Sequence, residues 1–176
     1  MPLISEVRTC LRKYLTFSGR ASRREYWLFV LFLFLGSLLL GLVDAALFDP
    51  EIVETGDGHV DYRSTGPLAG LFSLITLPPL VSAGWRRMHD TGRSGLFLVY
   101  PVLVMVGIVT FMGFMGGLDP MLAGDFAVAV AGGASAALLI AFFVLLISPL
   151  LVVWWLTRPS EAGPNAYGPN PNGVWK

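Results

Sequence analysis

The chain has 176 residues, of which 55% are hydrophobic and only 14% are charged. Soluble domains carry about 25% charged residues, so this composition excludes an ordinary water-soluble globule. The formal net charge is zero, but the charges are separated along the chain. Eleven of the 12 Lys and Arg fall before residue 26, within 86–93 or after residue 156, and eight of the 12 acidic residues lie elsewhere. Such a distribution indicates loops that face two different compartments.

Residues 1–22 are predicted to form a cytoplasmic amphipathic segment. Ile4, Val7, Leu11 and Leu15 recur at helical spacing with basic residues between them, which is typical of a short interfacial helix on the inner leaflet. Cys10 is the single cysteine, so no internal disulfide is possible.

Four apolar stretches are long enough to span a membrane, because a spanning helix needs about 20 apolar residues. They are residues 26–48, 68–85, 96–116 and 134–156. Ser22 and Glu25 have the spacing of a capping box, which places the start of the first helix near Arg23. The sequence therefore predicts an all-α polytopic membrane protein with a four-helix transmembrane domain over residues 23–157, built as a compact bundle.

The second stretch is interrupted near its middle by Pro78 and Pro79. Proline removes a backbone donor and disturbs the preceding helical turn. The pair predicts a helix kink shaped for packing, and a re-entrant hairpin is the alternative.

Orientation follows from the three basic segments, since cytoplasmic loops carry an excess of Lys and Arg. With four crossings, the N-terminus, the loop at 86–93 and the C-terminus all lie on the cytoplasmic side of a bacterial plasma membrane. The acidic loop 49–66 and the loop 117–126 then face outward. The tail, residues 158–176, is rich in Pro, Gly and Asn and is expected to be irregular, extended or partly disordered.

Three polar segments stand out on the predicted cytoplasmic side. They are residues 17–27 (FSGRASRREYW), 86–95 (RRMHDTGRSG) and 163–171 (GPNAYGPNP). In this order and placement they resemble the domain of unknown function 805 family, small inner-membrane proteins of bacteria with a Phe-x-Gly-Arg entry to the first helix, an Arg-x-x-Asp loop and a Gly-x-Asn-x-Tyr-Gly tail. The resemblance covers nearly the whole chain and implies a fold and a bacterial plasma membrane, but no reaction.

The arginines of these segments are the candidate binding residues. Converging guanidinium groups favour phosphate or carboxylate, so we predict a site for anionic lipid headgroups, or for an acidic or phosphorylated partner, made of Arg20, Arg23, Arg24, Arg86, Arg87 and Arg93. The alternative is that these arginines only set the topology of the chain.

Other residues of the same segments have predicted structural roles. Asp90 is expected to pair with Arg86 or Arg20 or to cap a turn, Ser22 and Glu25 to cap the first helix, and Ser94 to cap the third. The predicted interfacial anchors are aromatic: Tyr26, Trp27, Trp85, Trp154 and Trp155.

The sequence favours a non-catalytic integral inner-membrane protein over two other classes. A small-molecule transporter or exporter would use the helix broken at Pro78 and Pro79, and a membrane enzyme would use His89 and Asp90. No metal site is expected, because the second histidine, His59, is predicted on the opposite side of the membrane. No cofactor or nucleic acid is expected either. Membrane lipids and a homo-oligomer or a membrane-protein partner remain the predicted partners.

Overall fold

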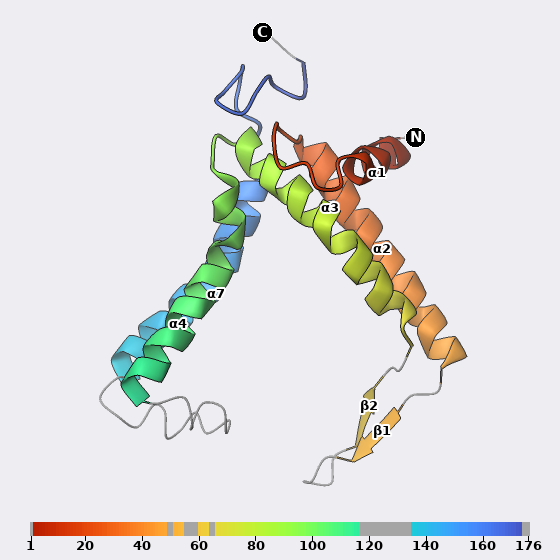
Figure 1. Cartoon of the computed structure of the whole chain (residues 1–176), viewed down its shortest axis with the longest axis vertical. Coiled ribbons are helices and arrows are strands. Elements are labelled where there is room, and N and C mark those ends of the chain that lie inside the picture. The colour runs from red at the N-terminus through yellow and green to blue at the C-terminus, as the bar shows by residue number, and fades with distance from the viewer. Residues whose placement is uncertain (1, 49–50, 55–59, 64–65, 117–134, 174–176) are drawn as a thin grey trace.

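The fold is predominantly helical, as the computed structural model of residues 2–48, 51–54, 60–63, 66–116 and 135–173 shows (Figure 1). Its elements are α1 (Pro2–Arg12), α2 (Arg23–Leu47), β1 (Glu51–Glu54), β2 (Val60–Arg63), α3 (Leu68–Asp90), the 3-10 helix η1 (Gly95–Val99), α4 (Tyr100–Gly116) and α7 (Ser135–Thr157). Among the described residues, three helices are long and apolar enough to cross a membrane, and Gly95–Phe111 is a shorter apolar helix. The predicted polytopic helical fold is confirmed.

Helices α2 and α3 form an antiparallel hairpin (Figure 1). They approach closely at Gly36, where an added Cβ would lie 2.6 Å from the ring of Phe72. At the far end of the hairpin the buried Asp44 accepts hydrogen bonds from the backbone N–H groups of Leu68 (3.0 Å) and Ala69 (2.8 Å). Its carboxylate thus caps the first turn of α3, where helical N–H groups lack partners and the helix dipole favours negative charge.

The loop between α2 and α3 contains a small β-hairpin. Strands β1 and β2 pair antiparallel, with Glu51 opposite Arg63 and Glu54 opposite Val60. The predicted acidic loop therefore contains regular structure, which its sequence did not indicate. The second loop predicted to face outward, residues 117–126, and His59 lie outside the described residues.

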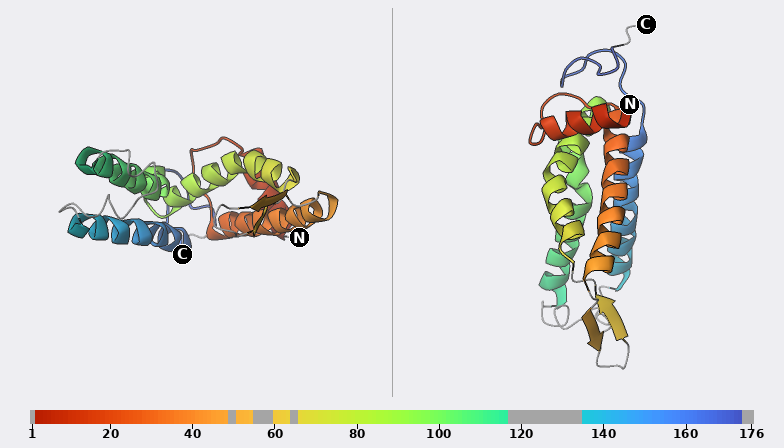
Figure 2. Two further views of the ribbon diagram at one scale, coloured as in Figure 1. Left: turned by 90° about the horizontal axis from the view of Figure 1, so that it is seen from below. Right: turned by 90° about the vertical axis from the view of Figure 1, so that its right-hand side faces the viewer.

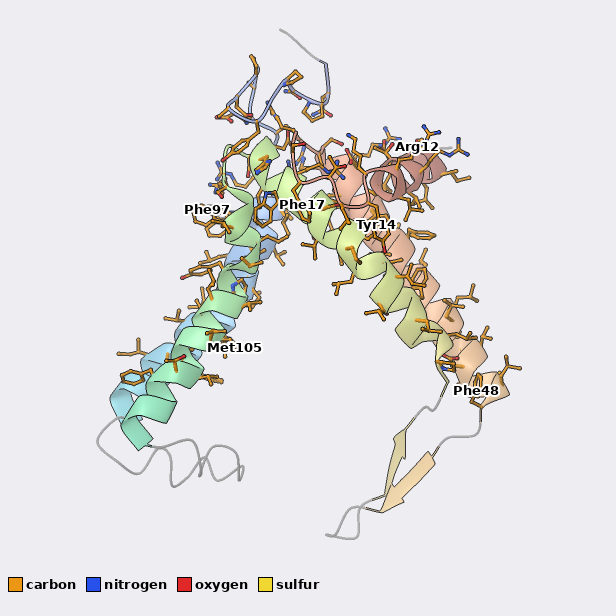
Figure 3. All side chains as sticks on the ribbon, in the orientation of Figure 1. Arg12, Tyr14, Phe17, Phe48, Phe97 and Met105 are labelled. Carbon is orange, nitrogen blue, oxygen red and sulfur yellow. The ribbon has the colours of Figure 1, made fainter. Side chains whose placement is uncertain are left out.

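Helix α3 is continuous through Pro78 and Pro79 and extends to Asp90, five residues beyond the predicted span. Two prolines in succession remove the donors that would bond the carbonyls of Leu74 and Ile75. The carbonyl of Ile75 instead accepts a hydrogen bond from the hydroxyl of Tyr14, a residue that lies against α3 (Figure 3). The uninterrupted course of α3 alongside α2 favours the helical span over the re-entrant alternative.

The remaining spans form a second antiparallel pair. The third begins with η1, whose N-cap Ser94 accepts from the N–H of Leu96 (3.3 Å), and continues into α4. Pro101 is the second residue of α4, a position where its missing donor has no intrahelical acceptor. Helix α7 covers the fourth predicted span within a residue at each end.

The two helix pairs diverge from each other. The prediction of a compact four-helix bundle is therefore wrong. The α2–α3 pair and the α4–α7 pair meet at one end of the molecule and separate toward the other (Figures 1 and 2). Large apolar side chains along both pairs are exposed, for example Leu74 at 67% and Leu150 at 64%. Because lipid tails are as apolar as these side chains, burial of apolar surface supplies little drive to close the pairs.

Helix α1 lies across the end where the pairs meet, and the tail lies at the same end (Figures 1 and 2). We call this the basic end; it comprises α1, the start of α2, residues 86–95 and residues 157–173. Cys10 of α1 is fully buried against α2 and α3, while Ile4, Leu11 and Leu15 are exposed. A helix is present where the amphipathic segment was predicted, but it ends at Arg12, before Leu15, and Val7 and Cys10 form its inward side.

Candidate functional site

The three polar segments singled out by the sequence meet at the basic end. Residues 17–27 contribute the loop after α1 and the first turn of α2, residues 86–95 contribute the end of α3, and the tail folds over both (Figure 1). Their charged side chains form a buried ion-pair cluster, which consists of Arg20, Glu25, Arg86, Arg87 and Asp90.

Asp90 is the acceptor at the centre of this cluster and is fully buried. Its Oδ1 accepts from Nε of Arg20 at 2.9 Å, and its Oδ2 accepts from Nη1 of Arg87 and from the hydroxyl of Ser160. The predicted pairing of Asp90 with Arg20 is confirmed, and Arg87 is a second partner. One carboxylate thus compensates two buried guanidinium groups, with a hydrogen bond from the tail.

Arg20 binds the tail as well as Asp90. Its Nη1 donates to the carbonyl of Gly163 at 2.7 Å, and its Nη2 donates to the carbonyl of Glu161, also at 2.7 Å. The planar guanidinium group offers five donors in a fixed geometry, so Arg20 can hold a carboxylate and several carbonyls at once. A lysine has no equivalent fork.

Arg87 connects α3 to the end of α7. Its Nε donates to the carbonyl of Leu156 at 3.0 Å, and its Nη2 donates to the carbonyl of Arg158. These carbonyls belong to the last turn of α7 and the residue just beyond it, where helical acceptors lack intrahelical donors. Arg87 is therefore a buried polar contact between the two helix pairs.

Arg86 pairs with Glu25 rather than with Asp90. Its Nη1 lies 2.6 Å from Oε1 of Glu25, and both side chains are buried. Ser22 caps α2 as predicted, since its hydroxyl accepts from the N–H of Glu25 at 3.1 Å. The Glu25 carboxylate, however, accepts from Arg86 instead of reaching back to the start of the helix. Within the described part of the chain, Nε and Nη2 of Arg86 are buried without a hydrogen-bond partner.

Cys10 lies against this second ion pair. Its thiol donates a weak hydrogen bond to Oε1 of Glu25, with a sulfur–oxygen distance of 3.8 Å. Burial first, and the negative charge of Glu25 second, raise the pKa of the Cys10 thiol to about 12. Since the thiolate is the reactive form, Cys10 is an inert packing residue at neutral pH.

His89 holds the tail and the loop after α1, and it does not form a catalytic pair with Asp90. Its ring stacks on Tyr167 with a centroid distance of 3.8 Å and an interplanar angle of 6°. Its Nδ1 lies 3.0 Å from the carbonyl of Gly19, and its own carbonyl accepts from Nδ2 of Asn165 at 2.9 Å. Nδ1 of His89 and both carboxylate oxygens of Asp90 are therefore bonded to structural partners.

Two motif glycines have geometric reasons to be present. Gly92 has a φ of +71° in the turn after α3, a conformation that other residues rarely adopt. At Gly95 an added Cβ would lie 2.1 Å from the indole of Trp85, so a side chain there would displace the tryptophan.

The six predicted anion-binding arginines fall into two groups. Arg20, Arg86 and Arg87 are buried in the cluster and already paired. Arg23 and Arg24 are exposed, and Arg93 is half-buried, lying 5.6 Å above the ring of Trp155. The structure brings the first group together around internal carboxylates and leaves only the second group accessible to an external anion.

The predicted interfacial aromatics also have unequal surroundings. Trp154 is 51% exposed and lies beside the guanidinium group of Arg158. Trp27 donates from Nε1 to the carbonyl of Leu156 at 3.3 Å. Tyr26 is buried in the core, and Trp85 packs edge-on against Phe17 and His89. Trp155 packs edge-on against two aromatic rings of the third span, Phe97 and Tyr100.

Sequence reasoning missed several members of this site. Ser160, Asn165 and Tyr167 bond or stack on residues near the end of α3, and Tyr14 bonds the carbonyl freed by proline. The quoted tail motif contained Asn165 and Tyr167, but no local pattern shows what they contact. For Tyr14, the available signal was the unpaired carbonyl that a helical proline leaves four residues before it.

These features define a class: a polytopic helical membrane protein with buried ion pairs at the basic end, where side chains of the first helix pair donate hydrogen bonds to carbonyls at the end of α7. A model of the family described as "Protein of unknown function (DUF805)" matches residues 14–169. The chain belongs to this family, and the resemblance noted from its motifs is confirmed. The matched region includes all five residues of the buried ion-pair cluster.

Two named relatives belong to Escherichia coli (strain K12). "Inner membrane protein YhaH" is 30% identical over 97 residues, which cover 55% of this chain and 72% of that protein. "Inner membrane protein YhaI" is 29% identical over 104 residues, which cover 59% of this chain and 76% of that protein. No solved structure matches the chain. Together with the apolar helices, these relatives identify a multi-pass protein of the inner membrane.

Proposed function

We propose that the protein is a non-catalytic inner-membrane protein whose basic end faces the cytoplasm and binds anionic phospholipid of the inner leaflet. One observation carries the proposal. The carboxylates of Asp90 and Glu25 are already paired with arginines of the cluster. Within the described residues, the basic side chains around the cluster form no ion pair. These are Arg8, Arg12, Lys13, Arg23, Arg24, Arg93 and Arg158.

Helix α1 supports a position at the membrane surface. An apolar groove of about 670 Å³ lies between α1 and Phe32 of α2, and Arg8 and Arg12 line it together with Ile4 and Leu11. An acyl chain in such a groove would bring its phosphate close to the two guanidinium groups. Apolar side chains beside basic ones are what interfacial helices use on anionic membranes.

The size of the expected attraction follows from the number of unpaired charges. A basic residue near an anionic surface contributes about 1 kcal/mol, so a few engaged arginines bias the protein clearly toward anionic lipid. Exposed charges are screened over about 8 Å at physiological salt. The attraction should therefore weaken as ionic strength rises.

The test uses the full chain in nanodiscs of phosphatidylcholine, with and without phosphatidylglycerol. Phosphatidylglycerol should raise the melting temperature, and added salt should reduce that increase. The variant Arg8→Gln/Arg12→Gln should lose part of the increase. Equal melting temperatures in the two lipid mixtures would refute the proposal.

Orientation needs a separate measurement. Reporter fusions after residue 173 and within the loop 49–66 should report opposite sides of the membrane, with the tail in the cytoplasm. A tail on the outer side would refute the proposed orientation.

A further inference from the structure

A cleft of about 830 Å³ opens at the basic end between the first turns of α2 and the tail. The lining residues include the polar side chains of Arg23, Arg24, Ser160, Asn170 and Asn172 and the indole ring of Trp27. Small-molecule and cofactor sites usually have volumes of about 300–1,000 Å³, so the cleft is large enough for a headgroup.

The cleft is positively charged. Two arginines line it, and no carboxylate is among its lining residues. Arg24 is exposed, and its side chain forms no hydrogen bond or ion pair within the described part of the chain. Nη1 of Arg23 makes a long hydrogen bond of 3.4 Å to the carbonyl of Thr157. Both arginines occupy the first turn of α2, where the helix dipole adds to the attraction for an anion.

The neutral part of the lining is suited to hydroxyl groups. Asn172 donates to the hydroxyl of Ser160 at 3.2 Å, and Asn170 donates to the carbonyl of Glu161 at 3.2 Å. A carboxamide offers two donors and an acceptor, so each asparagine keeps capacity for a ligand. A zwitterionic headgroup would bring an ammonium group, for which the lining offers no carboxylate.

From these contacts we infer that the cleft binds the phosphodiester and the hydroxylated headgroup of an anionic glycerophospholipid. The inference rests on the proposed function and assigns it a specific site. Arg23 and Arg24 hold the phosphodiester, and Asn170 and Asn172 bond the headgroup hydroxyls. The aromatic face of Trp27 lies beside the glycerol backbone.

The depth of the cleft favours a lipid over a soluble phosphate ester. Helix α2 begins at Arg23 and α7 ends at Thr157, so the cleft lies where two apolar helices leave the hydrocarbon. Trp27 is fixed at this level by its hydrogen bond to the carbonyl of Leu156. Indole rings are enriched at the headgroup level of membranes.

The test compares two double variants that remove the same charge. Arg23→Gln/Arg24→Gln changes the cleft, and Arg8→Gln/Arg12→Gln changes the groove beside α1. The delipidated protein in neutral detergent is titrated with phosphatidylglycerol, and bound lipid is counted by native mass spectrometry. A parallel titration uses sn-glycerol 3-phosphate as the soluble source of the same chemistry.

The cleft variant should bind phosphatidylglycerol at least about tenfold more weakly than the unaltered protein, because charge-assisted hydrogen bonds are the strong ones. The groove variant should lose about threefold or less, as expected for screened surface charge. Arg23→Lys/Arg24→Lys should recover only part of the affinity, since lysine cannot bind a phosphate through two parallel hydrogen bonds. Both arginines are exposed, so melting temperatures in detergent should not change.

Three results would overturn the inference. Equal losses in the two double variants would mean that only general charge acts, although the proposed function would survive. Tighter binding of sn-glycerol 3-phosphate than of phosphatidylglycerol would assign the cleft to a soluble ligand. Absence of any lipid binding by the unaltered protein would remove the inference and the proposed function together.

Discussion

Replacing Asp90 with asparagine should destabilise the protein strongly, because it leaves two guanidinium groups in the cluster without a counter-ion. The side chains of Asp90 and Arg87 are fully buried, and that of Arg20 is 1% exposed. Removing one partner of a buried ion pair lowers the free energy of unfolding by about 3–5 kcal/mol. Because Arg20 and Arg87 keep their bonds to carbonyl groups, we expect a loss near the lower end, about 3 kcal/mol.

The assay is a reversible unfolding titration of the purified protein with SDS in mixed micelles, followed by circular dichroism. The matched control is Ser160→Ala, which removes a neutral donor from Oδ2 of the same carboxylate and should lower the free energy of unfolding by about 1 kcal/mol. A loss in Asp90→Asn no larger than that in Ser160→Ala would refute the reasoning, because the carboxylate charge would then contribute nothing.

Three further predictions concern single contacts. Since the pKa of the Cys10 thiol is raised to about 12, maleimide should label it very slowly at neutral pH, and the rate should begin to rise only at a more alkaline pH than for a free thiol. Glu25→Gln removes a charge that raises this pKa and should speed labelling by up to about tenfold for each pKa unit by which the pKa falls; an unchanged rate would contradict the assignment. Tyr167→Ala loses the ring stacked on His89 at 3.8 Å, worth about 1 kcal/mol, and should speed proteolysis of the tail, whereas Tyr167→Phe should not; equal rates for both variants would exclude a role for stacking. Asp44→Ala removes the cap of α3 and should lower the free energy of unfolding by about 1–2 kcal/mol, as read by SDS titration; no change would mean that water replaces the carboxylate.

The helices were predictable because hydropathy and capping are local properties of the sequence. Helix α2 begins at Arg23, as the spacing of Ser22 and Glu25 predicted. Helix α7 matches the fourth apolar stretch, since a continuous apolar run can span lipid only as a helix or a strand of a closed barrel. These features need no knowledge of distant residues.

The partners within the cluster were only partly predictable, because they depend on which helices touch. Asp90 was expected to bind Arg20, and it does so across 70 residues of chain. Arg86 was an equally good partner from sequence alone, yet it faces Glu25, while Arg87 faces Asp90. Neighbouring residues on a helix point in directions about 100° apart, so helix packing decides between Arg86 and Arg87.

The separation of the two helix pairs was not predictable from the apolar pattern. All four spans are apolar on several sides, and lipid accepts such surfaces as readily as a neighbouring helix does. The contacts that fix the geometry are polar and lie at the ends, as Arg87 illustrates by bonding the carbonyl of Leu156. A hydropathy profile reports only the apolar character of each stretch, so it cannot predict these polar contacts.

The contacts of Arg20 impose an order on the assembly of the protein. Arg20 donates to carbonyls that follow it by 141 and 143 residues, so its buried environment cannot be completed until the last segment has left the ribosome. Until then Asp90 is the partner available to Arg20, because the other acceptors of its guanidinium group belong to the tail. The tail therefore completes the cluster last, because it supplies the remaining hydrogen-bond acceptors of Arg20. A chain truncated before residue 158 should still insert its helices, but its Arg20 and Asp90 side chains should be exposed to water.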